Sequence, residues 1–171
     1  TPINLPFPVN CDGATDSNDN IISNGNLQFI SSNIAYINNP LPDSTMNTAS
    51  FPYWDDLIDT ASGDGVFTST SGTAPNRILN IEWRAQYFPG SGSANFELRL
   101  YEGQTRFDVI YATVSNGNTS ATAGVQQNDT AFDQYFCDGS GGAGTGGQSY
   151  ILETCSPSPT PTARPSSTAT A

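Results

Sequence analysis

The sequence has no histidine and no lysine, and its five basic residues are all arginine. The absence of histidine removes the usual general base and the commonest zinc ligand, and the absence of lysine removes Schiff-base chemistry. Only carboxylates are left for acid–base catalysis. The adjacent Asp55 and Asp56 point to opposite faces if their segment is extended, so they do not form the facing pair that a glycosidase needs. We therefore expect no catalytic residues, no enzyme and no cofactor.

Positive charge and long apolar runs are also scarce. The formal net charge is -11 and the isoelectric point is near 4.1, so the chain repels nucleic acid and anionic membrane surfaces. No run approaches the ~18 apolar residues that span a bilayer. We expect neither nucleic acid nor membrane insertion. The abundant Ser, Thr, Asn and Gly are typical of a surface outside cells, and a start at Thr1 rather than Met is typical of a processed segment.

The sequence does contain strong strand patterns, clearest between Asn76 and Val125. Apolar and polar residues alternate with a period of two, as in strands with one buried face. The expected strands of this meander are 78–87, 95–102 and 105–114, with Pro89–Ser93 as the first connector and Glu102–Gln104 as the second. We expect the charges on the outer face, Arg77, Arg84, Arg99 and Arg106 with Glu82, Glu97, Glu102 and Asp108, to pair between neighbouring strands.

Shorter strand patterns flank the meander, and no amphipathic helix of useful length is present. We expect strands at 21–30, 66–70, 118–127, 132–136 and 148–154, with Asn24–Gly25 as a turn and Ile34, Tyr36 and Ile37 continuing the first of these. The predicted fold is all-β: an antiparallel, jelly-roll-like β-sandwich over residues 11–155. Residues 1–10 are an N-terminal extended strand, and 156–171 a tail rich in Pro, Ser and Thr.

The first nine residues alternate apolar side chains with prolines. Because prolines cannot donate to a sheet ladder, this segment is expected to be an edge strand. Its apolar face needs a partner, and we expect it to contact another chain. The predicted interface residues here are Ile3, Leu5, Phe7 and Val9.

An acidic loop is expected at Cys11–Asn20. Asp16, Asn18 and Asn20 have the one-three-five spacing of a calcium loop, which makes a structural calcium conceivable. Ile21 and Leu27 occupy the positions where such a loop needs Gly and Glu. Oxygen-rich loops are more often solvated turns, so calcium is the weaker interpretation.

Several blocks occur in order: S-N-G-N-L-Q-F (23–29), F-P-Y-W-D-D-L (51–57), G-T-A-P-N-R-I-L-N-I-E-W-R (72–84), N-F-E-L-R-L-Y-E (95–102) and A-T-A-G-V-Q (121–126). Together they resemble a bacterial extracellular β domain of the nidogen-like type over roughly residues 5 to 155. The resemblance implies an all-β module of large secreted or cell-surface proteins and brings no catalytic residues. Relatives tend to have a further segment upstream, and a Cys where this chain has Pro40.

The departure at Pro40 leaves three cysteines. A Cys137–Cys155 disulfide would clip the glycine-rich loop and the last strand, at about 3 kcal/mol by the loop-entropy model. Cys11 is then free or paired between chains, and a buried free thiol is an equally good alternative.

The tail favours an extended polyproline conformation, and its hydroxyls suit O-glycosylation. The candidate O-glycosylation sites are Ser156, Ser158, Thr160, Thr162, Ser166, Ser167, Thr168 and Thr170. Asn118 and Asn128 head N-glycosylation triplets, a weaker signal.

These patterns favour a structural protein, secreted or on the surface of a bacterial cell. We expect a subunit of an extracellular filament or surface assembly that polymerises with copies of itself, head to tail, through donor-strand-like terminal segments. Pro157, Pro159 and Pro161 are the expected tail contacts, and covalent glycans are expected. The alternative is a carbohydrate-binding or adhesion module that uses Tyr53, Trp54 or Tyr101 as an exposed aromatic platform.

Overall fold

The structure, a computed structural model, describes residues 1–9 and 16–151, and its regular elements there are thirteen β-strands. The strands are β1 (Pro2–Val9), β2 (Asp16–Ile22), β3 (Asn26–Gln28), β4 (Ala49–Trp54), β5 (Leu57–Ile58), β6 (Gly65–Ser71), β7 (Ile78–Tyr87), β8 (Ser91–Tyr101), β9 (Arg106–Val114), β10 (Thr122–Asn128), β11 (Ala131–Cys137), β12 (Ser140–Gly141) and β13 (Gly146–Ile151). Within the described ranges, no helix could cross a membrane.

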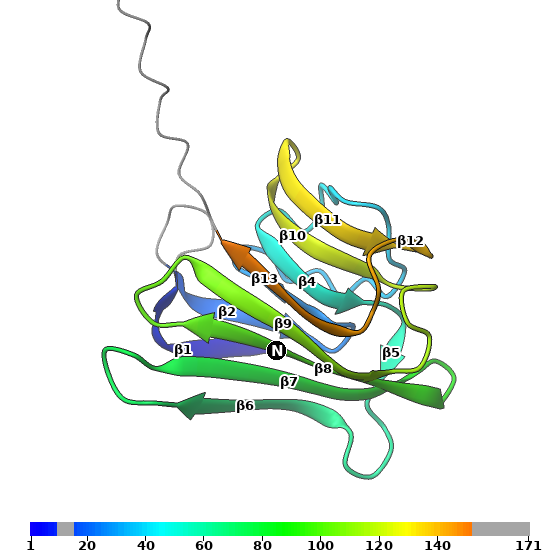
Figure 1. Cartoon of the computed structure of the whole chain (residues 1–171), viewed down its shortest axis with the longest axis horizontal. Coiled ribbons are helices and arrows are strands. Elements are labelled where there is room, and N and C mark those ends of the chain that lie inside the picture. The colour runs from blue at the N-terminus through cyan, green and yellow to red at the C-terminus, as the bar shows by residue number, and fades with distance from the viewer. Residues whose placement is uncertain (10–15, 152–171) are drawn as a thin grey trace, which may run out of the picture.

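The strands form two antiparallel sheets that face each other as a sandwich (Figure 1). Sheet A has the order β1-β2-β3-β4-β10-β11-β12. Sheet B has the order β13-β9-β8-β7-β5, with β6 also paired to β7. The predicted all-β antiparallel sandwich is therefore confirmed, and β1 is one of its strands.

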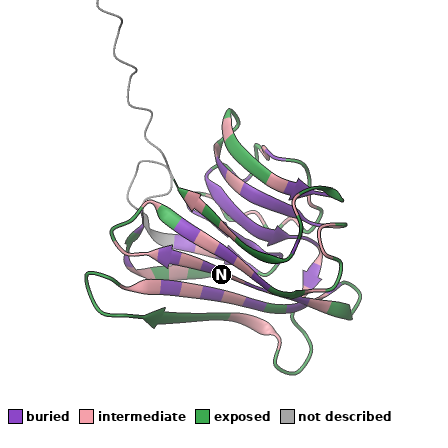
Figure 2. Cartoon of the chain, viewed as in Figure 1, coloured by how far each residue is buried: buried purple, intermediate pink, exposed green. Residues whose placement is uncertain are grey.

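The predicted meander forms the middle of sheet B, where β7, β8 and β9 are consecutive neighbours. Buried and partly buried residues alternate along β7 and β8, as the period of two predicts (Figure 2). The predicted connectors are close to the observed ones, although β8 begins at Ser91, inside the expected first connector. The outermost strand, β6, is exposed along most of its length (Figure 2).

The main core lies between the two sheets and is rich in aromatic side chains. The Tyr53 ring of β4 lies 5.4 Å from the Phe96 ring of β8. Trp83 stacks on Phe96 at 5.1 Å, and its indole N–H donates to the carbonyl of Ile22 in the opposite sheet, at 2.9 Å. These contacts join the sheets both by apolar burial and by a satisfied polar group.

A second, smaller cluster packs sheet A against the segment that connects β3 to β4, residues 29–48. Phe51 and Trp54 of β4 contribute fully buried rings, and Leu41 and Met46 contribute from the segment. All six residues of β4 are consequently buried, because one face of the strand meets sheet B and the other meets this segment.

Two local predictions are wrong. Ile34, Tyr36 and Ile37 do not continue a strand, and each is more than half exposed. The expected loop at Cys11–Asn20 is a strand from Asp16 onward, because residues 16–20 pair with β1.

Candidate interaction surface

Four of the eight exposed large apolar side chains of the described residues lie in one short stretch of the β3–β4 connection. Ile30, Ile34, Tyr36 and Ile37 are exposed by 63%, 76%, 54% and 63%. We call these four residues the apolar strip. Scattered exposed apolar residues are ordinary, whereas a contiguous group of large ones is typical of an interaction site.

The backbone under the apolar strip is held by residues that alternate with it. Asn33 donates from its backbone N–H to Gln28 Oε1 at 2.8 Å and from its side chain to Thr45 Oγ1 at 2.6 Å. The Trp54 indole N–H donates to the carbonyl of Ala35 at 3.0 Å. The strip is therefore presented on a fixed, extended segment, because its inward positions are bonded to the body of the domain.

Gln28 is the centre of this network, and its side chain is fully buried. Its Nε2 donates to the carbonyl of Asn33 at 2.7 Å and to Asn26 Oδ1 at 2.8 Å. Its Oε1 accepts from Ser31 Oγ at 2.7 Å and from the backbone N–H of Asn33. A buried amide bonded this completely fixes local conformation, because each broken bond would leave a buried polar group unsatisfied.

The far end of the segment is bonded to strands β10 and β11. The Asn38 side chain donates to Thr122 Oγ1 at 3.0 Å, and the backbone N–H of Leu41 donates to Gln134 Oε1 at 2.7 Å. Gln126 bonds to both backbone groups of Asp43. The segment is thus fixed on both sides of the strip.

The strip is also free of charge. The sequence from Phe29 to Pro42 contains no Asp, Glu, Lys or Arg, in a chain whose net charge is -11. Two copies of this chain repel each other in general, so an uncharged apolar surface is where they could approach with the least electrostatic cost.

One strip residue also borders a pocket that contains a predicted interface residue. Ile34 lines a pocket of about 480 Å³ together with Ile3 of β1, Ile22 of β2 and Val66 of β6. Ile3 thereby lies beside the strip. The pocket lies between the edge of sheet A and the edge of sheet B, and its lining is mixed, because Thr1, Ser23, Asp59 and Thr68 also contribute to it.

The other predicted interface residues of β1 lie in or against the domain's own core. Phe7 and Val9 are buried in the main core, and Leu5 is partly buried against it. The guanidinium of Arg77 lies 5.3 Å from the centre of the Phe7 ring. Among the described strands β1 pairs only with β2, so it is the edge strand that its prolines predict.

The outer face of sheet B carries the predicted charges, but most pair along a strand rather than between strands. Arg84 bonds to Glu82, Arg99 to Glu97 and Arg106 to Asp108, each two residues apart. Only the Arg77–Glu102 pair joins residues that flank different strands. The expectation of cross-strand pairing was therefore wrong for three of these four pairs.

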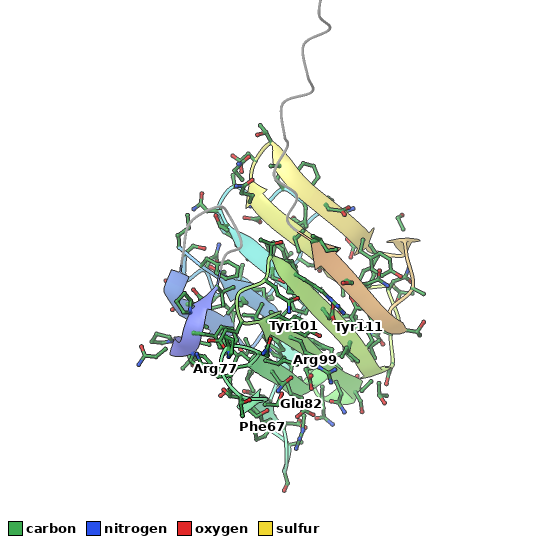
Figure 3. The ribbon with its side chains drawn as sticks, turned by 60° about the vertical axis from the view of Figure 1, so that its left-hand side comes forward. Phe67, Arg77, Glu82, Arg99, Tyr101 and Tyr111 are labelled. Atoms are coloured by element: carbon green, nitrogen blue, oxygen red, sulfur yellow. The ribbon has the colours of Figure 1, made fainter. Side chains whose placement is uncertain are left out.

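The register explains two of the three same-strand pairs; it does not explain the third, because Asp108 lies opposite Arg99 and yet bonds to Arg106. Glu82 lies directly opposite Glu97, so each carboxylate needs a cation from its own strand. Figure 3 shows Glu82, Arg99 and Tyr101 projecting from β7 and β8. Each described arginine is already bonded to a carboxylate, which argues against this face as an anion-binding surface.

The Arg77–Glu102 pair predicts a pH dependence of stability. Hydrogen bonds from Arg77 lower the pKa of Glu102 from 4.5 to about 2. Unfolding then takes up a proton between these pH values, so this pair's contribution is present above pH 4.5 and is lost as the pH falls toward 2. We expect Glu102→Gln to flatten the decline in unfolding free energy with acidification, measured by urea denaturation at several pH values.

Arg77→Gln should flatten the acid dependence in the same way, because it removes the partner that lowers the pKa of Glu102. Some acid dependence should remain in both variants, because Asp108 also has a lowered pKa and is unchanged in them. Burial alone would raise the pKa of Asp108, but hydrogen bonds from Arg106, Tyr101 and Ser149 lower it to about 2. If the unfolding free energy of both variants fell with pH as steeply as that of the unmodified chain, the Arg77–Glu102 pair would not be the source of the acid dependence.

The proposed aromatic platform is largely inaccessible. Tyr53 and Trp54 are fully buried, so neither can receive a glycan at the surface. Tyr101 is partly buried, and its hydroxyl donates to Asp108 Oδ2 at 2.6 Å. Exposed Tyr53 and Trp54 were wrong expectations, and carbohydrate binding stays a prediction without them.

The calcium prediction falls on a strand. Asp16, Asn18 and Asn20 belong to β2, and the Asn20 side chain donates to the carbonyl of Ser31 at 2.9 Å. An extended strand does not wrap around a cation as a calcium loop does. Calcium binding at these residues stays a prediction.

The predicted N-glycosylation residues differ in their surroundings. The Asn118 side-chain nitrogen, which a glycan would have to occupy, donates to the carbonyl of Gly142 at 2.6 Å. Asn128 is exposed, and its Oδ1 accepts from the backbone N–H groups of Thr130 and Ala131 in the β10–β11 turn. This arrangement leaves the Asn128 nitrogen without a role in the turn's hydrogen bonds, so Asn128 is the better candidate of the two.

Cys137 is buried beside the Thr122 hydroxyl and bridges to no other described cysteine, and burial raises the pKa of its thiol. Cys11 and Cys155 lie outside the described residues, so the Cys137–Cys155 disulfide stays a prediction. Also outside them are the predicted tail contacts Pro157, Pro159 and Pro161 and all the predicted O-glycosylation sites, which begin at Ser156.

The fold and its surface define a two-sheet antiparallel β-sandwich module. A family model described as NIDO related matches residues 1–156, so the chain belongs to the NIDO-related family, as its resemblance to nidogen-like domains predicts. No curated protein and no solved structure matches the chain significantly.

Proposed function

We propose that this chain is a structural subunit of an extracellular assembly, such as a filament or surface layer, and that it binds copies of itself through the apolar strip. The observation that carries the proposal is the strip's combination of exposure, absence of charge and fixed backbone. The family match supports an extracellular setting, and a bacterial source remains part of the proposal.

The energetics favour the strip as a contact. Burying an isoleucine side chain contributes roughly 1.5–3 kcal/mol, and the strip has three isoleucines more than half exposed. Much of the gain from an interface is normally lost in ordering its parts. The hydrogen bonds of Gln28 and Trp54 have already ordered this segment within the domain.

Addition of a strand at the sheet edge is a poorer route to assembly. Phe7 and Val9 of β1 are committed to the core, and the prolines at positions 2, 6 and 8 remove three N–H donors from the edge strand. Of the other edge strands, β6 presents mostly Ser and Thr, β12 has only two residues, and β13 begins with two glycines. Side-chain contacts through the strip therefore replace donor-strand exchange in this proposal.

The proposal is tested with Ile34→Asp, which places a carboxylate in the centre of the strip. Because an interfacial charge without a partner must be desolvated, we expect self-association to weaken by roughly a hundredfold. Sedimentation velocity over a range of concentrations gives the association constant, and negative-stain electron microscopy shows whether regular assemblies remain.

Phe88→Asp is the matched control. Phe88 is exposed by 63%, like two of the strip isoleucines, but lies in the β7–β8 turn, outside the strip. This variant carries the same new charge and should assemble like the unmodified chain. A monomeric unmodified chain at high concentration, or equal loss of assembly in both variants, would refute the proposal.

A further inference from the structure

A second pocket lies between the sheets at the open side of the sandwich. It has a volume of about 290 Å³, and its walls come from β4, β10 and β11 of sheet A, from β9 and β13 of sheet B, and from the two ends of the β3–β4 connection. Apolar walls are supplied by Phe29, Phe107, Val125, Phe132 and Tyr150. We call this the inter-sheet pocket.

One polar atom in this pocket has no partner. The Ser50 side chain is only 2% exposed and lines the pocket, and its hydroxyl makes no hydrogen bond. Ser50 lies opposite Leu27, which is in the main core, and opposite Val125, which packs against that core, so its side chain faces the space between the sheets. A buried hydroxyl without a partner is costly to the folded state, and a ligand that bonds to it would remove that cost.

The lining defines the chemistry of a ligand. Phe132 and Ile151 are exposed by 45% and 63%, so they mark the mouth, whereas the nearly inaccessible Ser50 marks the inner wall. Asp133 is the one charged side chain in the lining, and no arginine is present to hold a carboxylate or a phosphate. The fitting group is uncharged, with an apolar body and a hydroxyl or amide at its tip.

We propose that the inter-sheet pocket receives the Tyr36 side chain of a second copy of this chain. Tyrosine has an apolar ring with a hydroxyl at its tip, as the lining requires. Tyr36 is the one exposed tyrosine among the described residues, at 54%, and it lies on the uncharged strip. In a chain of net charge -11, the strip and this pocket, with its single carboxylate, can meet without strong repulsion.

This inference rests on the proposed function and names the surface to which the strip binds. The donor, Tyr36, lies in the middle of the β3–β4 connection, whereas only the ends of that connection, Phe29 and Thr48, line the acceptor pocket between the sheets. Each copy then carries one donor side chain and one acceptor pocket, so the same contact can repeat from one copy to the next.

The test is a double-mutant cycle in the full chain with Tyr36→Phe and Ser50→Ala. Each variant removes one hydroxyl, and we expect each to weaken self-association by about fivefold, the effect of one hydrogen bond. The double variant should be no weaker than either single variant, because the same bond is lost. Ser50→Ala removes a buried hydroxyl without a partner, so denaturation should show an unchanged or higher stability.

A second measurement uses the peptide Ser-Ser-Asn-Ile-Ala-Tyr-Ile-Asn-Asn, which copies residues 31–39. Titrated by calorimetry into the full chain carrying Ile34→Asp, it should bind saturably, and Ser50→Leu, which fills the pocket, should abolish the binding. Independent effects of the two hydroxyls, or peptide binding unchanged by Ser50→Leu, would overturn the inference.

The two proposals fail in different ways. If Ile34→Asp abolishes assembly while Ser50→Leu assembles normally, the strip binds elsewhere and only the pocket inference falls. If the unmodified chain is monomeric, the proposed function falls, and the peptide titration still decides whether the pocket accepts this segment. Peptide binding that requires removal of the residues after Ile151 would instead assign the pocket to the chain's own terminal segment.

Discussion

Trp54→Ala is expected to destabilise the domain by about 3–5 kcal/mol, the range for removal of a large buried aromatic side chain. Trp54 is fully buried, its ring lies 5.4 Å from that of Phe51, and its indole N–H holds the carbonyl of Ala35. The substitution removes the centre of the second cluster and the bond beneath the apolar strip. Urea denaturation followed by far-ultraviolet circular dichroism measures the loss.

Trp54→Phe separates packing from hydrogen bonding. It keeps an aromatic ring in the cluster but leaves the carbonyl of Ala35 without its donor, so we expect a smaller loss of about 1–2 kcal/mol. Hydrogen exchange should show faster exchange in residues 29–48 for both variants, and more so for Trp54→Ala. An unchanged stability of Trp54→Ala together with loss of glycan binding would instead restore the platform hypothesis.

The meander was predictable because its physics is local. In β7 every second residue from Leu79 to Tyr87 is buried. Successive side chains of a strand point to opposite faces, so the sequence alone predicts which residues face the core. The pairing of its charges was not predictable from spacing alone. Glu82 faces Glu97 only because of the register between β7 and β8, and that register depends on the turn geometry and on the core beneath.

The apolar strip shows where alternation gives the wrong answer. Ile34 and Tyr36 alternate with Asn33 and Ala35, which on a half-buried strand would place the apolar residues inward. Here Asn33, and not the side chain of the isoleucine beside it, is held against the domain. The buried Gln28 side chain of sheet A bonds to the backbone N–H and carbonyl of Asn33. A buried glutamine has no signature in hydrophobic periodicity. The available signal was the density of Ser and Asn around it, which favours side-chain bonds to the backbone.

The N-terminal strand was predicted correctly as an edge strand, but its apolar face packs on the domain itself: Phe7 and Val9 lie in the main core, and Ile3 and Leu5 lie against it. The prolines identify an edge because they remove donors, and this depends only on their chemistry. Whether Phe7 and Val9 contact another chain or are buried in the domain's own core depends on the positions of the edges of the two sheets, which the local sequence does not specify. Both are buried in the main core, so their removal would open it.

Gly25→Ala should have the second large effect, about 3 kcal/mol or more, at a turn that the Asn24–Gly25 pair predicts. Gly25 has a φ of +80°, and a Cβ there would lie 1.8 Å from the carbonyl oxygen of Tyr53. The clash cannot be relieved by a side-chain rotation, because Tyr53 O is backbone and the Tyr53 N–H donates to the carbonyl of Gly25. Chemical denaturation gives the change in unfolding free energy.

Gly103→Ala is the matched control for the steric part of this effect. Gly103, in the β8–β9 turn, has a φ of +69°, close to that of Gly25, but a Cβ there would meet no atom within 4 Å. It should cost only the backbone strain of a left-handed non-glycine residue, about 1 kcal/mol. Similar losses for the two variants would mean that strain alone matters and that β4 does not press on the β2–β3 turn. A much larger loss for Gly25→Ala would show that this turn is fixed against the strand carrying Tyr53 and Trp54, and hence that the strip's support begins there.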